Sequence, residues 1–200
     1  MANVEHSTLN ALTESHEPKG AISATLGQVY VADGAASGAW QKVQGFGQYN
    51  DSRVTAGTPT QTMATGVRTQ LICDGAGGTI EYPPSDATAP LWNVTTNKHE
   101  PIRAFDVYEI RLTFVANGYA GANPYLTLEL DIGGSIGVIV SRTVYLSKGG
   151  ADQLILLSFP VYTGTTYLAN GGTLYCTYTG TGTVTTFSNN IYIGRTQRNT

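Results

Sequence analysis

The chain has 200 residues, of which only 12% are charged, and its net charge at pH 7 is −3. Lysine and arginine are scattered singly, so there is no basic patch for a phosphate backbone, and nucleic acid is not an expected partner. No apolar run reaches the roughly 18 residues that a membrane span needs. The start, Met-Ala-Asn-Val-Glu-His, lacks the basic and apolar regions of a secretory signal. We therefore expect no membrane partner and synthesis in a cytosol.

The low charge also bears on the surface of the protein. Soluble globular domains usually carry about twice this share of charged residues. A lone monomer with so few surface charges would be poorly soluble. We therefore expect copies of the chain, or other partners, to cover much of its surface.

Residues 1–44 differ in composition from the rest and are predicted to form an extended arm. A short polar stretch ends at Pro18, and an isolated strand is predicted over residues 28–32. Trp40 is the expected anchor of the arm's end. Because nothing in this segment can bury a core of its own, we expect packing on a partner to order it.

Residues 45–200 are predicted to form an all-β domain, with Gly45 and Gly47 as the hinge from the arm. Runs of β-branched and aromatic residues recur, and glycine-rich or proline-rich turns separate them. The predicted strands span residues 69–74, 79–82, 107–115, 125–132, 136–145, 153–162, 173–178, 183–187 and 191–195.

Two of these runs alternate strictly between apolar and polar residues. Every second residue is apolar from Tyr108 to Phe114, and again from Leu126 to Ile132. A period of two predicts a sheet with one buried face. Some eight strands over about 150 residues predict two packed sheets, a jelly-roll-like β-sandwich without an amphipathic helix. The polar stretches 50–66 and 94–100 are predicted to be exposed loops.

Tyrosine is unusually frequent, with 12 residues against 5 phenylalanines. A tyrosine buries an apolar ring and keeps a hydroxyl that needs a partner. The excess fits half-buried positions in strands. It also fits a subunit interface, where tyrosine is enriched.

The sequence offers little for catalysis or metal binding. His6 and His16 lie in the arm, and His99 lies in a polar loop, where a solvated side chain is expected. No nucleophile stands in a familiar motif with a base. Cys73 and Cys176 are predicted to be buried, inert thiols, and their spacing does not suit zinc. We therefore expect no metal and no cofactor.

One pair of acids could suit glycoside hydrolysis. Glu129 and Asp131 lie two apart in a predicted strand, so both point to its polar face. Exposed acids on such a face are typical of a solvated surface. A carbohydrate-active enzyme is therefore the weakest hypothesis, and the prediction is a protein that is not an enzyme.

Four pieces of the arm together resemble an N-terminal signature of tailed-bacteriophage virion proteins. The signature comprises Leu12-Thr13, His-Glu-Pro-Lys-Gly at 16–20, Val-Tyr-Val-Ala-Asp-Gly at 29–34 and Gly-Ala-Trp at 38–40. We associate it with capsid decoration (cement) proteins, head fibres and some tail-associated proteins. Later stretches, starting at residues 130, 158, 168 and 191, resemble the trimeric jelly rolls on such virions, and more weakly the tumour-necrosis-factor-type trimers.

The resemblance implies a homotrimeric decoration protein on the outer surface of a phage capsid, made in the cytoplasm of the host bacterium. Its partner would be the major capsid protein, whose neighbouring subunits the arm would clamp. The residues expected to make this contact are Leu9, Leu12, His16, Pro18, Lys19, Val29, Tyr30, Val31 and Trp40.

The alternative is a receptor-binding module of a tail or head fibre. The arm would then attach to the fibre or tail, and loops of the jelly roll would recognise a host glycan. Tyr82 and Trp92, which flank the Pro83-Pro84 pair, are the candidate ligand residues. The number of copies on the virion separates the two hypotheses.

Overall fold

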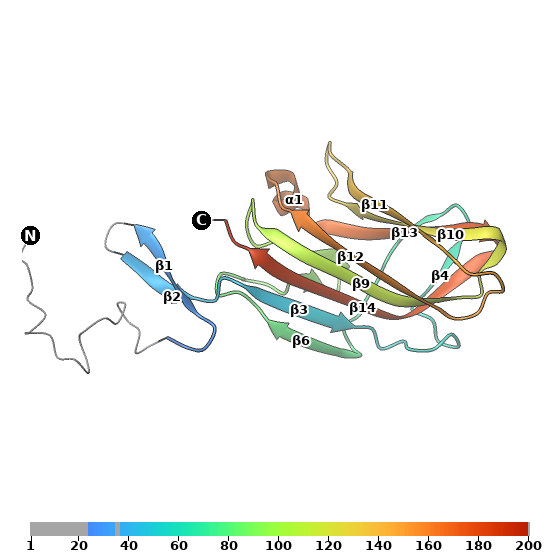
Figure 1. Cartoon of the computed structure of the whole chain (residues 1–200), viewed down its shortest axis with the longest axis horizontal. Helices are drawn as coiled ribbons and strands as arrows, with labels where there is room; N and C mark the ends of the chain where they lie inside the picture. Colours follow the sequence, from blue (N-terminus) through green and yellow to red (C-terminus); the bar gives the residue numbers. More distant parts are fainter. Residues whose placement is uncertain (1–23, 35–36, 200) are drawn as a thin grey trace, which may run out of the picture.

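The computed structural model describes residues 24–34 and 37–199. Two antiparallel six-stranded sheets pack face to face, and a separate two-stranded sheet lies beside one end of them (Figure 1). The chain is therefore an all-β sandwich with an N-terminal extension, as predicted.

The first sheet has the strand order β12-β9-β14-β3-β6, with β4 also paired to β14. Its strands are β3 (Gly45–Asn50), β4 (Gln61–Ala64), β6 (Gly78–Tyr82), β9 (Val107–Asn117), β12 (Gln153–Tyr162) and β14 (Thr183–Gln197). The second sheet has the order β11-β10-β13-β8-β7, with β5 paired to β13. Its strands are β5 (Arg68–Gln70), β7 (Trp92–Asn93), β8 (Lys98–His99), β10 (Ala120–Asp131), β11 (Val138–Tyr145) and β13 (Gly172–Thr181).

The strand pairing is that of a jelly roll. Eight strands define it, in chain order β3, β5, β9, β10, β11, β12, β13 and β14. The first pairs with the last, the second with the seventh, the third with the sixth and the fourth with the fifth. This is the pattern of one long hairpin rolled up into two sheets.

The facing surfaces of the two sheets form the hydrophobic core. Tyr108, Ile110, Leu112 and Phe114 of β9 are 0% exposed, and the alternate leucines of β10 are at most 1% exposed. Burying one such side chain contributes roughly 1.5–3 kcal/mol. The buried faces predicted for residues 107–115 and 125–132 are therefore confirmed.

Residues 183–195 form one strand, β14, where the sequence predicts two. A β-bulge shifts the register between Phe187 and Asn190. Ser188 has a φ of 55°, and buried Asn189 donates from Nδ2 to the carbonyl oxygen of Ile72 at 2.8 Å. The polar residues at the bulge hide the continuity of the strand in the sequence.

One short helix was not expected. Helix α1 (Thr165–Asn170) lies between β12 and β13, and the backbone N–H of Gly171 caps it by donating to the carbonyl oxygen of Tyr167. Gly171 has a φ of 70°, which favours glycine. Six residues are too few to show a helical period, so the sequence prediction lacked a signal.

Three further local predictions are wrong. Residues 50–66 contain strand β4 and the buried side chains of Asp51 and Met63, and residues 94–100 contain strand β8. Gly45 and Gly47 lie within β3 and not in a hinge. A Cβ on Gly47 would lie 2.5 Å from the Tyr49 hydroxyl, so the glycine is required by close packing.

Many tyrosines lie over glycines two residues away on the same face of a strand. A Cβ on Gly194 would lie 2.7 Å from the hydroxyl oxygen of Tyr192, and a Cβ on Gly180 would lie 2.1 Å from that of Tyr178. A ring that covers a glycine regains apolar contact that the missing side chain cannot make. Part of the tyrosine excess is therefore a packing device within strands.

Candidate assembly and ligand-binding surfaces

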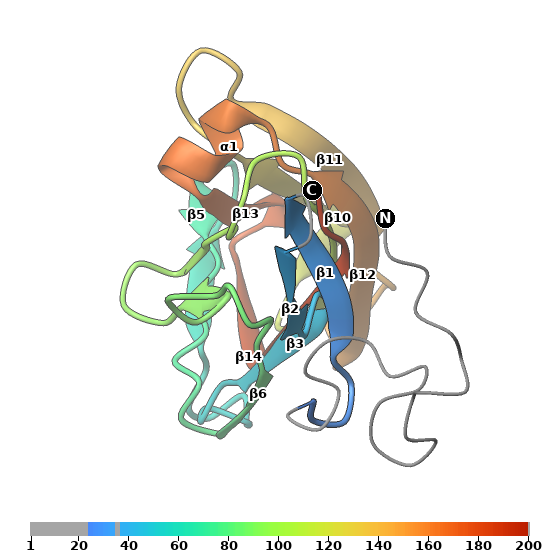
Figure 2. The same cartoon turned by 90° about the vertical axis from the view of Figure 1, so that its left-hand side faces the viewer.

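The two-stranded sheet is a β-hairpin that stands apart from the sandwich (Figures 1 and 2). Strand β1 (Val29–Gly34) pairs with β2 (Ser37–Gln41), with Tyr30 opposite Trp40. Their rings lie edge to face, with centroids 5.6 Å apart. The isolated strand predicted over residues 28–32 therefore has a partner strand, and that prediction is wrong. A two-stranded hairpin is at best marginally stable in water without further packing.

Both faces of this hairpin carry apolar side chains, and polar Gln41 lies opposite Val29 on one of them. Tyr30 and Trp40 share one face, and Val29 and Val31 share the other, because successive side chains of a strand alternate. Val29 is 47% exposed. Asp33 is the single charged residue in the sequence from 29 to 41. The hairpin thus offers a partner apolar side chains on both faces, with almost no charge to desolvate.

Four residues of the predicted contact set lie in this hairpin. Tyr30 and Trp40 form its aromatic pair, and Val29 and Val31 lie on the opposite face. The other five lie outside the described residues; they are Leu9, Leu12, His16, Pro18 and Lys19.

The base of the hairpin is fastened to the sandwich. Arg195 donates from Nε to the carbonyl oxygen of Val43 at 2.7 Å, and its guanidinium pairs with Asp86 at 2.7 Å and with Asp106 at 3.1 Å. The side chains of Arg195 and Asp106 are 0% exposed. Burial acts to lower the pKa of Arg195, but these carboxylates outweigh it and raise the pKa above its usual value. The hairpin therefore projects from a firmly held base.

Three aromatic rings from neighbouring strands lie in a row on the outer face of the first sheet. Tyr82 of β6 lies 5.2 Å from Phe46 of β3, and Phe46 lies 5.5 Å from Tyr192 of β14, measured between ring centroids. The Cζ atom of Arg111, from β9, lies 5.1 Å from the Tyr192 centroid. Tyr82 is 60% exposed. We call Tyr82, Phe46 and Tyr192 the aromatic row.

A hollow of about 660 Å³ lies beside the aromatic row, next to the base of the hairpin. Gly45 and Gly194 line it with backbone, while Lys42, Gln44 and Thr196 line it with polar groups. None of its lining residues is acidic. This volume is within the usual range for small-molecule sites.

Strand β12 is an edge strand of the first sheet and carries a second exposed apolar surface. Leu154, Leu156 and Tyr162 point outward and are 65%, 67% and 60% exposed. Phe105 stacks on Tyr162 with ring centroids 5.9 Å apart. Pro160 lies in the same strand and offers no N–H, which protects the strand edge against pairing with another strand. A partner would therefore pack on the face of β12 and not extend the sheet.

The two candidate ligand residues, Tyr82 and Trp92, do not share a site. Trp92 is 0% exposed in β7, and its Nε1 donates to the carbonyl oxygen of Cys73 at 3.4 Å. Its backbone N–H donates to the Tyr49 hydroxyl at 3.1 Å. The prediction for Trp92 is therefore wrong, because it belongs to the core. Tyr82 is exposed, in the company of Phe46 and Tyr192.

His99 is also buried, contrary to prediction. It is 1% exposed, and its Nδ1 lies 2.7 Å from the Tyr167 hydroxyl. Burial lowers the pKa of His99 to about 3, so the ring is neutral at physiological pH. Cys73 and Cys176 are buried free thiols, as predicted, and burial raises the pKa of each to about 12.

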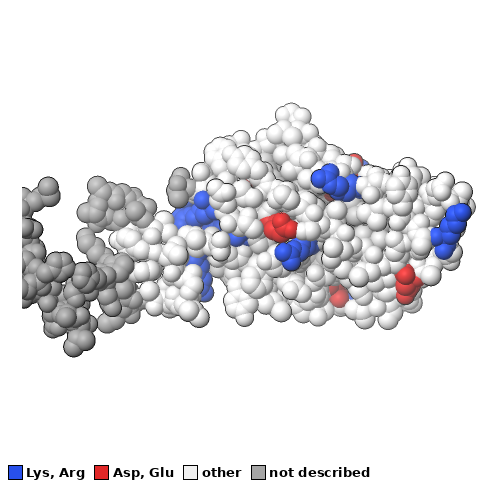
Figure 3. All heavy atoms as spheres, in the orientation of Figure 1, with Lys and Arg blue, Asp and Glu red and all other residues white. Residues whose placement is uncertain are grey.

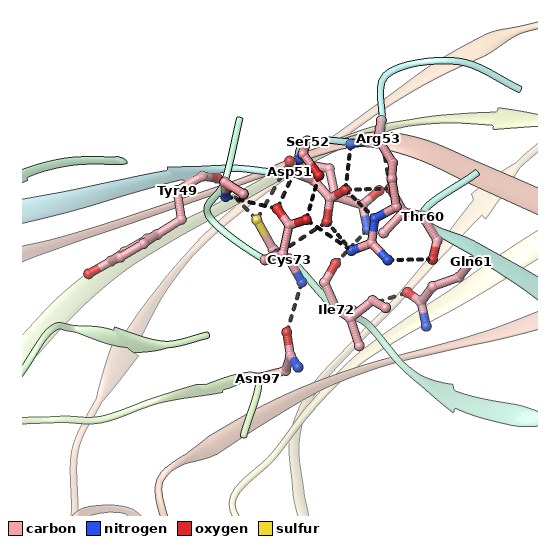
Figure 4. Close-up of polar contacts among 12 residues, drawn as sticks. Tyr49, Asp51, Ser52, Arg53, Thr60, Gln61, Ile72, Cys73 and Asn97 are labelled. Atoms are coloured by element: carbon pink, nitrogen blue, oxygen red, sulfur yellow. Dashed lines mark hydrogen bonds and ion pairs between the residues drawn. The ribbon is translucent and has the colours of Figure 1, made fainter. Parts of the chain in front are cut away.

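A polar cluster ties the chain after β3 to the segment between β5 and β6 (Figure 4). Buried Asp51 accepts hydrogen bonds from Arg53 at 2.6 and 2.7 Å, from the Thr60 hydroxyl at 3.2 Å and from the Asp74 backbone N–H at 3.1 Å. Burial acts to raise the pKa of Asp74, but hydrogen bonds from Ser52 and a backbone N–H outweigh it and lower the pKa. Since the Asp51 side chain is 0% exposed and Asp74 accepts hydrogen bonds from Ser52 and Ala76, both carboxylates are used within the cluster and stabilise the loop.

Glu129 and Asp131 share the polar face of β10, as predicted, but they are ion-paired. Arg68 contacts Glu129 at 2.7 Å and Asp131 at 2.8 Å, and its Cζ lies 3.7 Å from the Tyr175 ring centroid. A backbone hydrogen bond from Gly133 lowers the pKa of Asp131. A glycosidase acid needs a raised pKa, so this pair lacks the required electrostatics.

Within residues 24–34 and 37–199, no three His, Cys, Asp or Glu side chains gather closely enough to hold a metal ion. In the same part of the chain, no helix has the length and apolar character needed to cross a membrane. The candidate surfaces are therefore the hairpin, the aromatic row with its hollow, and the outer face of β12.

Comparison with known proteins gave matches to solved structures alone. No protein-family model matches the chain, and no curated protein matches it in sequence. Eiger TNF from S. frugiperda aligns over 79% of this chain and 94% of its own, with 7% identity and a TM-score of 0.46. The PRD1 vertex protein P5 aligns over 86% of this chain and 83% of its own, with 13% identity and a TM-score of 0.39.

VP2 of infectious bursal disease virus, in a subviral particle, aligns over 86% of this chain but 39% of its own, with 11% identity and a TM-score of 0.35. This chain thus spans well under half of that protein. Because the TM-scores of these three structures are below 0.5, these likenesses leave the function to be argued from the residues of this chain.

Proposed function

We propose that the chain is a structural virion protein, a homotrimeric capsid decoration (cement) subunit on the outer surface of a phage head. The β1–β2 hairpin carries this proposal. It carries apolar side chains on both faces, is almost free of charge and is held at its base by buried Arg195, so it presents a surface that needs a partner. The resemblance of residues 12–40 to a phage virion signature supports the major capsid protein as that partner.

A clamp of this kind stabilises a shell by mass action. It binds neighbouring major capsid subunits once they are assembled, so binding favours the assembled state. Three arms on one trimer would add avidity, because the second and third arms engage at high effective concentration. The other five residues of the predicted contact set, from Leu9 to Lys19, would extend the contact beyond the hairpin.

The outer face of β12 is the contact proposed for the trimer. Leu154, Leu156 and Tyr162 offer an apolar surface of the kind that subunit interfaces bury. On the adjacent strand, Glu109 and Arg111 lie 3.7 Å apart and offset each other's charge. A second copy would therefore meet little electrostatic repulsion there.

The second candidate is a receptor-binding module of a tail or head fibre that recognises a host glycan. The aromatic row favours it, because a row of aromatic rings on the outer face of a sheet is typical of a binding surface. The same hairpin would then attach the module to the fibre or tail.

The first test is deletion of residues 1–40, which leaves the Lys42 backbone hydrogen bonds to Ser85 in place. The truncated protein should remain a folded trimer by sedimentation, with a melting temperature within about 2 °C of the full chain. It should no longer bind shells stripped of this protein. Retained shell binding would show that the arm is not the attachment.

Quantitative mass spectrometry of virions separates the two candidates. One copy of this chain for every one to several copies of the major capsid protein indicates a decoration protein on the capsid lattice. A ratio at least tenfold lower places the chain on a tail or fibre and contradicts the cement proposal.

A further inference from the structure

We propose that the hollow beside the aromatic row binds an acidic carbohydrate. The hollow is lined by the three rings of the aromatic row and by Lys42, and these two features indicate the chemical class of ligand. The inference is independent of where on a virion the chain is attached. It also stands if the arm does not bind a capsid.

The aromatic row provides the platform. The three rings come from three adjacent strands, with centroids 5.2 and 5.5 Å apart, so they form a stripe across the sheet. The C–H face of a pyranose ring packs well on such a stripe, while its hydroxyls stay in water. Two of the rings, Tyr82 and Tyr192, carry hydroxyls that can bond a sugar at the edge of the platform.

Two glycines let the wall of the hollow pack closely. A Cβ on Gly45 would lie 2.4 Å from the carbonyl oxygen of Tyr82, and a Cβ on Gly194 would lie 2.7 Å from the Tyr192 hydroxyl oxygen. Glycine at both positions therefore allows the close packing that places Tyr82 and Tyr192 at the hollow. Gln44 and Thr196 on the rim supply amide and hydroxyl groups of the kind that bond sugar hydroxyls.

The charge of the hollow favours an acid. Lys42 lines it, and within the described residues no carboxylate pairs with its ammonium group. Arg195 is already neutralised by two aspartates, and Arg111 lies at the far end of the aromatic row. Figure 3 shows basic atoms, and no acidic ones, at the end of this face beside the hairpin. A carboxylate-bearing sugar would satisfy both Lys42 and the rings.

The chemistry of the row also differs from that of the β12 face. Leu154 and Leu156 offer aliphatic side chains that suit a protein partner. In the hollow the one aliphatic side chain is Leu26, which comes from the arm, and every other side-chain contact is aromatic or polar. An amphipathic ligand fits this lining better than an apolar peptide does.

The experiment titrates the full chain with a panel of acidic oligosaccharides, namely oligogalacturonate, oligoalginate, hyaluronan hexamer and sialyllactose, and with neutral galacto-oligosaccharides of matched length. Binding is measured by saturation-transfer NMR and calorimetry. We expect at least one acidic ligand to bind about tenfold or more tightly than its neutral counterpart, and to weaken at 0.5 M NaCl. No binding to any acidic member, or equal binding to the neutral one, overturns the proposal.

Variants locate the site. Tyr82→Ala and Lys42→Gln should each weaken binding about tenfold, whereas Tyr82→Phe, which keeps the ring, should retain most of it. The matched controls are Tyr145→Ala, at a tyrosine 71% exposed on β11, and Lys148→Gln. Controls that weaken binding as much as the site variants would place the ligand elsewhere. A melting temperature measured for every variant shows that each has folded.

Discussion

The sandwich and the hairpin are both antiparallel β-structure, yet they differ in what holds them together. The sandwich buries a continuous core between two sheets, with Trp92, Tyr108 and Phe114 fully enclosed. The hairpin has one pair of strands and one aromatic pair, Tyr30 with Trp40. The same backbone hydrogen bonding is thus supported by a core in the sandwich but by one aromatic pair in the hairpin, and a lone two-stranded hairpin is at best marginally stable in water.

A large effect on the sandwich, equal to that of removing a core tryptophan, should come from Arg195→Met. The change leaves Asp106, which is 0% exposed, and Asp86 without their cation. Loss of one partner from a buried ion pair costs about 3–5 kcal/mol of the free energy of unfolding. Urea denaturation of the full chain measures it.

The matched control is Arg111→Met in the same sheet. The Arg111 side chain is 57% exposed, and its Nε lies 3.7 Å from Glu109, so its removal should cost less than about 1 kcal/mol. If both variants lost equal stability, the buried ion pair would not be what fastens the base of the hairpin.

A smaller effect is expected from pH. The pKa of His99 is lowered to about 3 by burial, from an ordinary value of 6.5. Below pH 6.5 the unfolded chain binds a proton at His99 that the folded chain does not bind. The free energy of unfolding therefore decreases as the pH is lowered. The loss should be about 1 to 2 kcal/mol between pH 6.5 and 5.

The measurement uses a background with His6 and His16 changed to Gln, so that His99 is the remaining histidine. His99→Gln should flatten the pH dependence between 6.5 and 5. The carboxylates whose pKa is lowered, Asp74, Asp86 and Asp131, titrate near and below their ordinary pKa of 3.8 and leave this window clear. An unchanged slope in His99→Gln would show that another group carries it.

Strands β9, β10 and β12 were predictable because one face of each is buried and the other is in contact with solvent. The predicted bounds 153–162 coincide with β12, and the predicted inward faces of β9 and β10 are the observed ones. Prediction failed at Trp92 and His99, which lie in strands of two residues. Two residues cannot show a period, so the polar neighbours of His99 suggested a loop that the fold buries.

The candidate surfaces were harder to predict, since they depend on which strands become neighbours. Phe46, Tyr82 and Tyr192 are far apart in the sequence, and the order β6-β3-β14 alone brings their rings together. The second strand of the hairpin, β2, begins Ser-Gly-Ala, which lacks β-branched residues. Its place is set by pairing with β1, which local propensity does not encode.

The smallest effect on stability should come from Trp40→Ala, and it separates the two regions most directly. The chain has two tryptophans, one in each region. Trp92→Ala should cost about 3–5 kcal/mol, because it leaves a large cavity in the core. Trp40→Ala should change the free energy of unfolding of the sandwich by less than about 0.5 kcal/mol, because the hairpin adds nothing to that core.

Trp40→Ala should still loosen the hairpin, since the edge-to-face pair with Tyr30 contributes roughly 0.5–1.5 kcal/mol to it. Amide hydrogen exchange at Val31 should then be faster, while exchange at Ile110 in β9 stays slow. Shell binding should weaken because the hairpin is less stable, even though the melting temperature of the sandwich stays the same. An equal loss of melting temperature in the two tryptophan variants would mean that the hairpin is part of the folded unit, and the division between a stable domain and an element awaiting a partner would fail.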